Sequence, residues 1–170
     1  HTVNQPDKTD VFELEMHPSK KNVYLVDGKE HLLESFKAKL SMKILGIPFK
    51  VFKKYYRSIY GPTLKNKTGY FSVRTPALEE VRGLEQWWRM NKTKSFKEFY
   101  DVLKMEALPG YNIGYADKND TIFYISNGLI PKRAPGYNWK EVVPGNTMKT
   151  LWTSTYSLEE LPQVIQPNFS

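Results

Sequence analysis

The sequence predicts an α+β fold in which antiparallel strands and hairpins accompany a central pair of helices. Apolar and polar residues alternate with period two through much of the first 75 residues, as in half-buried strands. Over residues 76–108 the apolar residues recur instead at helical spacing. Residues 109–170 then return to a hairpin and a tail rich in proline and aromatic residues. Strands, then helices, then strands are typical of α+β proteins.

The first block contains several expected strands and one hairpin. The segment VFELEMH alternates, and Asp27-Gly28 lies between two strand-like runs, which is a hairpin signal. Two long basic strands are predicted over residues 32–45 and 48–58. A turn follows at Pro62, because proline cannot continue a ladder of hydrogen bonds, and GYFSVR predicts another strand.

The helix pair and the second hairpin complete the expected elements. The first helix is predicted from a stripe of apolar residues: Leu78, Val81, Leu84, Trp87 and Trp88. Ser95 followed by Glu98 is a capping box that starts the second helix. A hairpin is predicted to turn at Asn119-Asp120, and SLEEL in the tail predicts a short helical turn.

Composition excludes several classes of protein and site. The chain has 170 residues, of which 40% are hydrophobic, so it is too apolar for a disordered segment. No apolar run approaches the ~20 residues of a membrane-spanning helix. The absence of cysteine excludes disulfides, thiolate metal sites and a cysteine nucleophile. No P-loop, Rossmann, HExxH or GxSxG motif is present.

The net charge of +7 is concentrated in one stretch. Ten lysine or arginine residues and no acidic residue lie between Lys37 and Arg74. This stretch is open to three interpretations: a nucleic-acid site, the solvated face of half-buried strands, or a face that docks on an acidic part of a longer protein. The alternation in FKAKLSMKI favours the solvated strand face.

The segment DKTD is a candidate metal site. Asp7 and Asp10 are two carboxylates three positions apart with backbone carbonyls between them, so they could hold a hard cation such as calcium through oxygen. The same spacing is frequent in ordinary turns, because aspartate bonds to its own backbone. His17 and His31 are too scattered for a zinc site and are interpreted as strand or loop residues.

Several segments resemble the penicillin acylase family of N-terminal-nucleophile hydrolases, closest to the branch of acyl-homoserine-lactone acylases. They are YADKNDTIFY, NGLIPKR, VPG and EELPQV, together with YRSIYGPTL and the opening HTVNQPDKTDVFEL. The resemblance covers nearly the whole chain. It implies a four-layer αββα sandwich, of which this chain is expected to be a central fragment of the β-subunit.

The resemblance also implies a mechanism. The catalytic serine of the family lies at the N-terminus of the β-subunit, upstream of His1, and its own α-amine is the general base. The oxyanion hole of the family takes one backbone N–H, which aligns with Val3, and one asparagine side chain expected beyond Ser170. The fragment alone is therefore expected to be inactive, since an N–H donor stabilises an oxyanion only where a nucleophile creates one.

Further site residues follow from the resemblance position by position. The acyl pocket of the family aligns with His1, Gln5, Trp87 and Tyr111. Its calcium ligands align with the carboxylates of Asp7 and Asp10 and the carbonyls of Thr9 and Trp139. The family has proline at the position of Trp139.

The implied function is hydrolysis of a small-molecule acyl amide by the complete protein, in the periplasm or outside the cell, with a role in antibiotic degradation. The expected partners are the α-subunit and the rest of the β-subunit, with no nucleic acid and no membrane span. The alternative is a stand-alone basic α+β module that binds nucleic acid or another polyanion.

Overall fold

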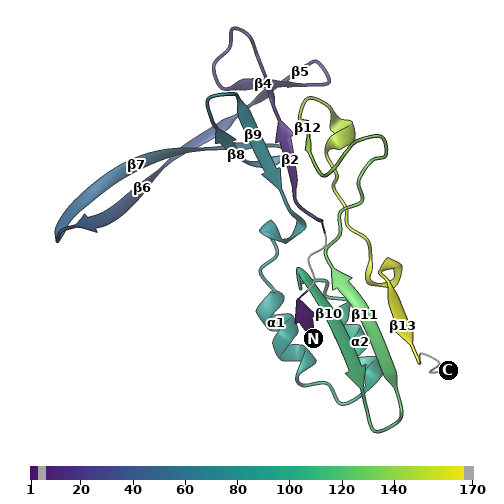
Figure 1. The fold of residues 1–170 in the computed structure, drawn as a ribbon. Coiled ribbons are helices and arrows are strands. Elements are labelled where there is room, and N and C mark those ends of the chain that lie inside the picture. Colours follow the sequence, from purple (N-terminus) through teal and green to yellow (C-terminus); the bar gives the residue numbers. More distant parts are fainter. Residues whose placement is uncertain (4–6, 167–170) are drawn as a thin grey trace. The chain divides into compact units, whose positions relative to one another are not determined.

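The computed structural model describes residues 1–3 and 7–166, so the predicted pocket residue Gln5 lies outside the described residues. The chain forms two compact units, each built from segments that are separated in the sequence. Unit 1 comprises residues 1–8, 75–132 and 153–170, and unit 2 comprises residues 9–74 and 133–152. Figure 1 shows the elements of both units.

Unit 1 contains an antiparallel sheet with the strand order β1-β10-β11-β13. These strands are β1 (Thr2–Val3), β10 (Gly110–Ala116), β11 (Ile122–Gly128) and β13 (Gln163–Ile165). The hairpin between β10 and β11 turns at Asn119-Asp120, as predicted. The Asp117 carboxylate accepts hydrogen bonds from the N–H groups of Asn119 (2.9 Å) and Thr121 (3.2 Å), which holds the turn closed.

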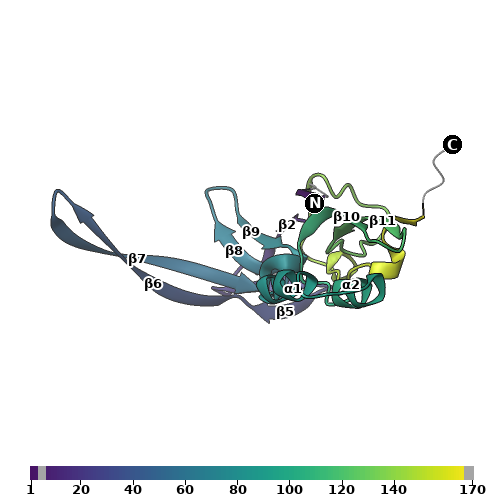
Figure 2. The same cartoon turned by 90° about the horizontal axis from the view of Figure 1, so that it is seen from below.

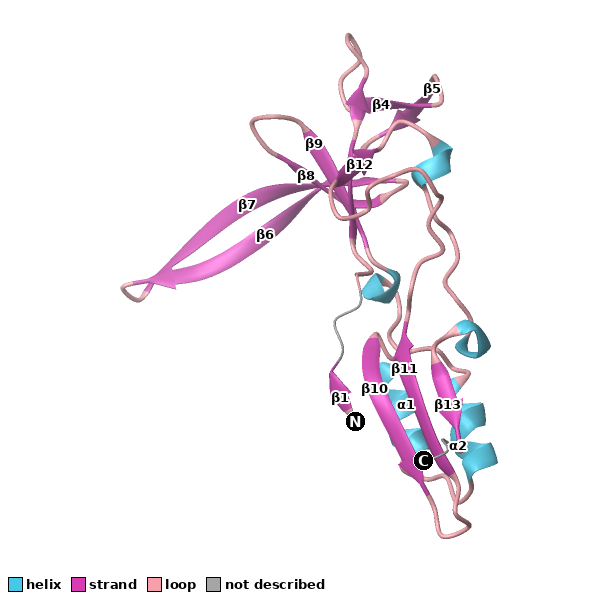
Figure 3. Cartoon of the chain, turned by 45° about the vertical axis from the view of Figure 1, so that its right-hand side comes forward, coloured by secondary structure: helices cyan, strands magenta, loops and turns pink. Residues whose placement is uncertain are grey.

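Two short helices cover one face of this sheet (Figure 3). They are α1 (Gly83–Met90) and α2 (Phe96–Leu103). The core between helices and sheet contains Met90, Phe99, Leu103, Leu108, Ile113, Phe123, Ile125, Leu158 and Leu161. The predicted cap of α2 is present, because the Ser95 hydroxyl accepts a hydrogen bond from the Glu98 N–H (3.3 Å).

The first helix is shorter than the apolar stripe that predicted it, and most of the stripe is exposed. A 3-10 turn spans Pro76–Leu78, and α1 begins only at Gly83. Four of the five side chains are exposed: Leu78, Val81, Leu84 and Trp88. The buried face of α1 carries Gln86 and Met90 instead, because the Gln86 Oε1 accepts a hydrogen bond from the Ala107 N–H (2.7 Å).

Unit 2 contains a larger sheet with the strand order β12-β2-β9-β8-β7-β6. Its strands are β2 (Asp10–Glu13), β6 (Glu34–Ile44), β7 (Ile47–Ser58), β8 (Gly61–Lys65), β9 (Tyr70–Arg74) and β12 (Val142–Pro144). Strand β12 is parallel to β2, and the other pairs are antiparallel. The core of this unit contains Phe12, Leu14, Tyr24, Val26, Leu33, Tyr60 and Val143.

A separate three-stranded sheet in unit 2 contains the predicted Asp-Gly hairpin. It consists of β3 (Glu15–Met16), β4 (Val23–Val26) and β5 (Lys29–Leu32). Asp27 and Gly28 both have positive φ (48° and 74°), as a two-residue hairpin turn requires. The predicted hairpin is therefore present, and it turns at two residues that tolerate positive φ.

The two long basic strands form as predicted, but they are not half-buried. Strands β6 and β7 pair along their whole length and extend beyond the rest of their sheet (Figures 1 and 2). Strand β8 pairs with β7 only over Tyr56–Ser58. Large apolar side chains along the extension are exposed, so the alternation that predicted a buried face corresponds to an uncovered one.

Candidate functional site

The candidate site in unit 1 lies where the first residues of the chain pair with β10. Thr2 is opposite Asn112, and Val3 is opposite Tyr111. Residues directly opposite each other in a ladder project to the same face, so Val3 and Tyr111 share one face. Thr2 and Asn112 share the other face, where the Asn112 side-chain amide donates a hydrogen bond to the Thr2 hydroxyl (3.3 Å).

Three aromatic rings meet beside this pairing. The centroid of the His1 ring lies 4.6 Å from that of Trp87 and 5.6 Å from that of Tyr111. The Trp87 and Tyr111 rings are 5.3 Å apart, and all three pairs are tilted or edge-on. Such contacts between rings are favourable beyond the area they bury. The structure thus brings together three of the four predicted pocket residues, and their role in binding an acyl group stays a prediction.

Helix α1 places Trp87 in this cluster through its contacts at two positions. At its start, Arg82 donates to both carboxylate oxygens of Glu80 (2.9 and 2.6 Å) and to the Met105 carbonyl (3.3 Å). One turn later, the buried Gln86 bonds to the backbone of Ala107. Because Gln86 fixes the rotation of the helix, the neighbouring Trp87 packs against the core and the adjacent Trp88 is exposed.

The Glu80 carboxyl should remain ionised in acid. The Arg82 guanidinium, which bonds to it, lowers the pKa of Glu80 to about 2 from an ordinary value of 4.5. Since the folded pKa is the lower one, the pair stabilises unit 1 above pH 4.5 and loses this contribution as the pH falls toward 2. The gain is below about 1 kcal/mol because water screens the pair.

An NMR titration of the Glu80 side chain measures this pKa directly. The variant Arg82→Gln should return it toward its ordinary value, whereas Arg89→Gln, which removes the partner of Glu85 instead, should leave it low. A midpoint near 4.5 in the unsubstituted protein would contradict the prediction.

The residues of the predicted metal segment lie in very different environments. Asp7 and Thr9 are exposed, whereas Asp10, the first residue of β2, is 1% exposed. The Lys8 ammonium donates a hydrogen bond to the Pro109 carbonyl, and burial lowers the pKa of this amine. The positively charged Lys8 side chain, which follows Asp7 in the sequence, is therefore held in place.

The Asp10 carboxylate forms an ion pair with Arg133 and accepts hydrogen bonds through Oδ2 within unit 2. Arg133 donates through Nε to Oδ2 (3.0 Å), and its Nη2 lies 2.8 Å from Oδ1. The indole N–H of Trp152 also donates to Oδ2 (2.6 Å). The Arg74 guanidinium carbon lies 4.6 Å from the centroid of the Trp152 ring, and the Arg74 Nε donates a hydrogen bond to the Trp152 carbonyl (3.0 Å). Asp10 is thus the centre of a buried network of charged and aromatic side chains.

This arrangement gives Asp10 a cationic partner other than calcium. Calcium takes 6–8 oxygen ligands, and a dication at Asp10 would be repelled by the guanidinium that already neutralises it. Trp139, another predicted ligand in unit 2, packs on the same Arg133 guanidinium (5.5 Å) and donates its indole N–H to the Ala134 carbonyl (2.9 Å). Within residues 1–3 and 7–166 no group of three histidine or acidic side chains could hold a metal. Calcium binding by the complete protein at Asp7, Thr9, Asp10 and Trp139 stays a prediction.

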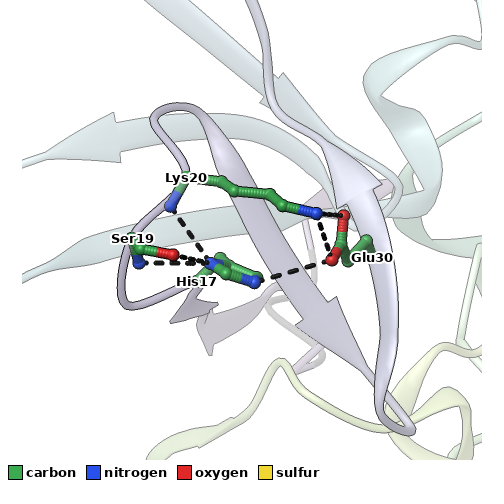
Figure 4. Close-up of polar contacts among 4 residues, drawn as sticks. All are labelled: His17, Ser19, Lys20 and Glu30. Carbon is green, nitrogen blue, oxygen red and sulfur yellow. Dashed lines mark hydrogen bonds and ion pairs between the residues drawn. The ribbon is translucent and has the colours of Figure 1, made fainter.

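A polar cluster in unit 2 that the sequence did not predict surrounds His17 (Figure 4). The His17 Nδ1 accepts hydrogen bonds from the N–H groups of Ser19 (3.2 Å) and Lys20 (3.1 Å), and Nε2 lies 3.5 Å from the Glu30 carboxylate. The Lys20 ammonium bonds to both oxygens of Glu30 and lowers its pKa. His17 therefore closes the loop that follows β3, in agreement with its interpretation as a loop or strand residue.

Comparison with known proteins assigns the family. The family model described as penicillin amidase matches residues 1–169. The chain belongs to the penicillin amidase family. Within this family it is 28% identical over 162 residues to penicillin G acylase of Escherichia coli, which covers 95% of this chain and 19% of that protein. It is 27% identical over 140 residues to the acyl-homoserine lactone acylase PvdQ of Pseudomonas syringae pv. syringae, which covers 77% and 18% respectively.

The fold agrees with this membership. The thermostable penicillin G acylase from Alcaligenes faecalis superposes with a TM-score of 0.82 at 22% identity, over 98% of this chain and 30% of that chain. The predicted α+β, N-terminal-nucleophile hydrolase fold is therefore confirmed. The chain spans about a fifth of the length of the two curated relatives. In the described part of the chain no helix is long and apolar enough to cross a membrane.

Proposed function

We propose that the complete protein containing this chain hydrolyses a small-molecule acyl amide through an acyl-enzyme on an N-terminal serine, and that unit 1 supplies one wall of its acyl pocket. The observation that carries the proposal is the ring cluster of His1, Trp87 and Tyr111 beside the Val3–Tyr111 pair. Membership of the penicillin amidase family supports the class of reaction.

In the proposed site the aromatic rings bind the acyl group and the backbone of β1 binds the carbonyl oxygen. Aromatic faces remove apolar acyl groups from water, while the His1 ring adds one polar edge to the wall. Val3 lies two residues from His1, so a substrate with its acyl group on the rings would bring its carbonyl close to the backbone of β1. A backbone N–H donor at a developing oxyanion is worth about 2.7–4 kcal/mol of transition-state stabilisation.

The reaction class is tested with the complete protein and chromogenic amides that carry acyl groups of increasing length. The proposal expects turnover with an initial burst, and a mass increase of one acyl group on the N-terminal serine. The 170-residue chain expressed alone should show no turnover. Hydrolysis without an adduct on that serine, or no hydrolysis of any acyl amide, would contradict the proposal.

Substitution of Trp87 tests the contribution of unit 1 to specificity. In the complete protein, Trp87→Ala should lower kcat/KM for the preferred acyl amide by roughly 10–200-fold, the range expected when apolar pocket contacts are lost. Trp88→Ala is a matched control, because the adjacent Trp88 side chain is 62% exposed and is not part of the ring cluster. Equal losses in both variants would indicate a general effect on α1 and not a pocket contact.

We further propose that the partners of this chain are the α-subunit and the rest of the β-subunit, and that the protein acts in the periplasm or outside the cell. The relatives named above are acylases, and none is a nucleic-acid-binding module, so the alternative of a stand-alone polyanion-binding module has no support among them.

A further inference from the structure

The ribbon formed by β6 and β7 has two chemically different faces. Residues opposite each other in the β6–β7 register share a face. One face, here called the apolar face, carries the pairs Phe36–Tyr55, Ala38–Lys53, Leu40–Val51 and Met42–Phe49, followed by Ile47. The other, here called the lysine face, carries the pairs Lys37–Lys54, Lys39–Phe52, Ser41–Lys50 and Lys43–Pro48.

The apolar face is uncovered in unit 2. Its large side chains are between 41% and 60% exposed: Phe36, Leu40, Met42, Ile47, Phe49 and Val51. This part of the ribbon has only two strands, because β8 joins β7 only from Tyr56 onward. A two-stranded ribbon is marginally stable alone in water, and a contiguous row of exposed apolar side chains marks an interaction surface.

The distribution of charge identifies the kind of partner. Five lysines point away from the apolar face, so a surface that covers the apolar face leaves them in solvent. A nucleic acid or an anionic lipid headgroup would engage the lysine face and leave the apolar side chains exposed. Either ligand would leave the side chains of the apolar face in water, whereas a protein surface packed on this face would remove them from water.

One residue of the apolar face is charged. Lys53 lies in the second of the pairs on this face, opposite Ala38, and its ammonium is 5.7 Å from the Tyr55 ring centroid. Any protein surface that covers this face takes the Lys53 ammonium out of water, which is costly unless the ammonium is paired. The partner surface should therefore offer a carboxylate or carbonyl oxygen to Lys53 within an apolar groove.

We infer that the apolar face of the β6–β7 ribbon packs into an apolar groove with one acceptor for Lys53, formed by the acylase polypeptide outside these 170 residues. The curated relatives devote about four-fifths of their length to such polypeptide, since the matched part is 19% and 18% of theirs. The inference rests on the proposed function in that it takes the complete protein to be a larger acylase.

Thiol labelling tests which face is covered. The chain has no cysteine, so a single cysteine introduced into residues 34–58 can be followed by mass spectrometry of that segment in the complete protein. Leu40→Cys and Val51→Cys probe the apolar face, and their sequence neighbours Ser41→Cys and Lys50→Cys are matched controls on the lysine face. The apolar-face cysteines should be alkylated at least about tenfold more slowly than the controls, as expected for sites that react only through local opening.

Several outcomes would overturn the inference. Equal alkylation rates on the two faces would show that no partner covers the apolar face. Protection that increases with protein concentration would identify a second copy as the occupant. Protection that appears only on addition of phosphatidylglycerol vesicles would identify a lipid surface, and protection of the lysine face by single-stranded DNA would identify a polyanion site.

The unsubstituted protein gives a second measurement that does not depend on any variant. Backbone hydrogen exchange of residues 36–55 should be slow in the complete protein, and fast exchange there would count against a packed ribbon. Amide hydrolysis is assayed on the same samples, so loss of the proposed function and loss of the docking surface are distinguishable. A protected ribbon in a protein without acylase activity would support the docking surface and contradict the proposed enzymatic function.

Discussion

Replacing Asp10 by alanine is expected to lower the free energy of unfolding of unit 2 by about 3–5 kcal/mol, the cost of breaking a buried ion pair from one side. The carboxylate is 1% exposed and balances the Arg133 guanidinium, whose side chain is 15% exposed. Without Asp10 this guanidinium and the Trp152 indole N–H lose their acceptor in a site that water does not reach freely.

Hydrogen exchange of peptides from unit 2 in the complete protein measures this effect as a loss of protection. The exposed Asp7→Ala is the matched control, and its effect should be within about 0.5 kcal/mol. The double variant Asp10→Ala with Arg133→Met should recover part of the loss, because no unpaired charge is then buried. If a chelator reproduced the Asp10→Ala loss in the unsubstituted protein, a metal ion and not Arg133 would be the main partner of Asp10.

Replacing Gly61 by alanine is expected to destabilise unit 2 by about 2–4 kcal/mol, through backbone strain and a steric clash together. Gly61 begins β8 with a φ of +135°, a conformation that side chains other than glycine rarely adopt. A Cβ atom added there would lie 2.3 Å from the Val73 carbonyl oxygen in β9, which is backbone and cannot rotate away.

The control for Gly61 is another glycine of unit 2 with positive φ and open space. Gly28 has a φ of 74°, and a Cβ atom there meets no other atom within 4 Å. Gly28→Ala should therefore cost only the backbone term, about 1 kcal/mol. Comparable exchange protection in the Gly28→Ala and Gly61→Ala variants would show that a small shift of β8 relieves the clash with β9.

The sequence by itself determined the features that depend on a few neighbouring residues. Asp27-Gly28 specifies its hairpin because both residues tolerate positive φ, and Ser95 specifies the start of α2 because its hydroxyl accepts the otherwise free N–H of Glu98. The order of short segments along the chain was also sufficient to indicate the family, which the match over residues 1–169 then established. None of these features requires knowledge of distant contacts.

Only the tertiary structure decided which faces are covered and which charges are paired. The spacing of apolar residues predicted the helix α1 and a half-buried strand β6, yet periodicity indicates only that an apolar face exists and not what packs on it. Asp10 had the spacing of a metal ligand, but its partner Arg133 lies 123 residues away and reaches it only through the folding of unit 2. A carboxylate has the same chemistry in both roles, so the groups that surround it after folding determine which role it takes.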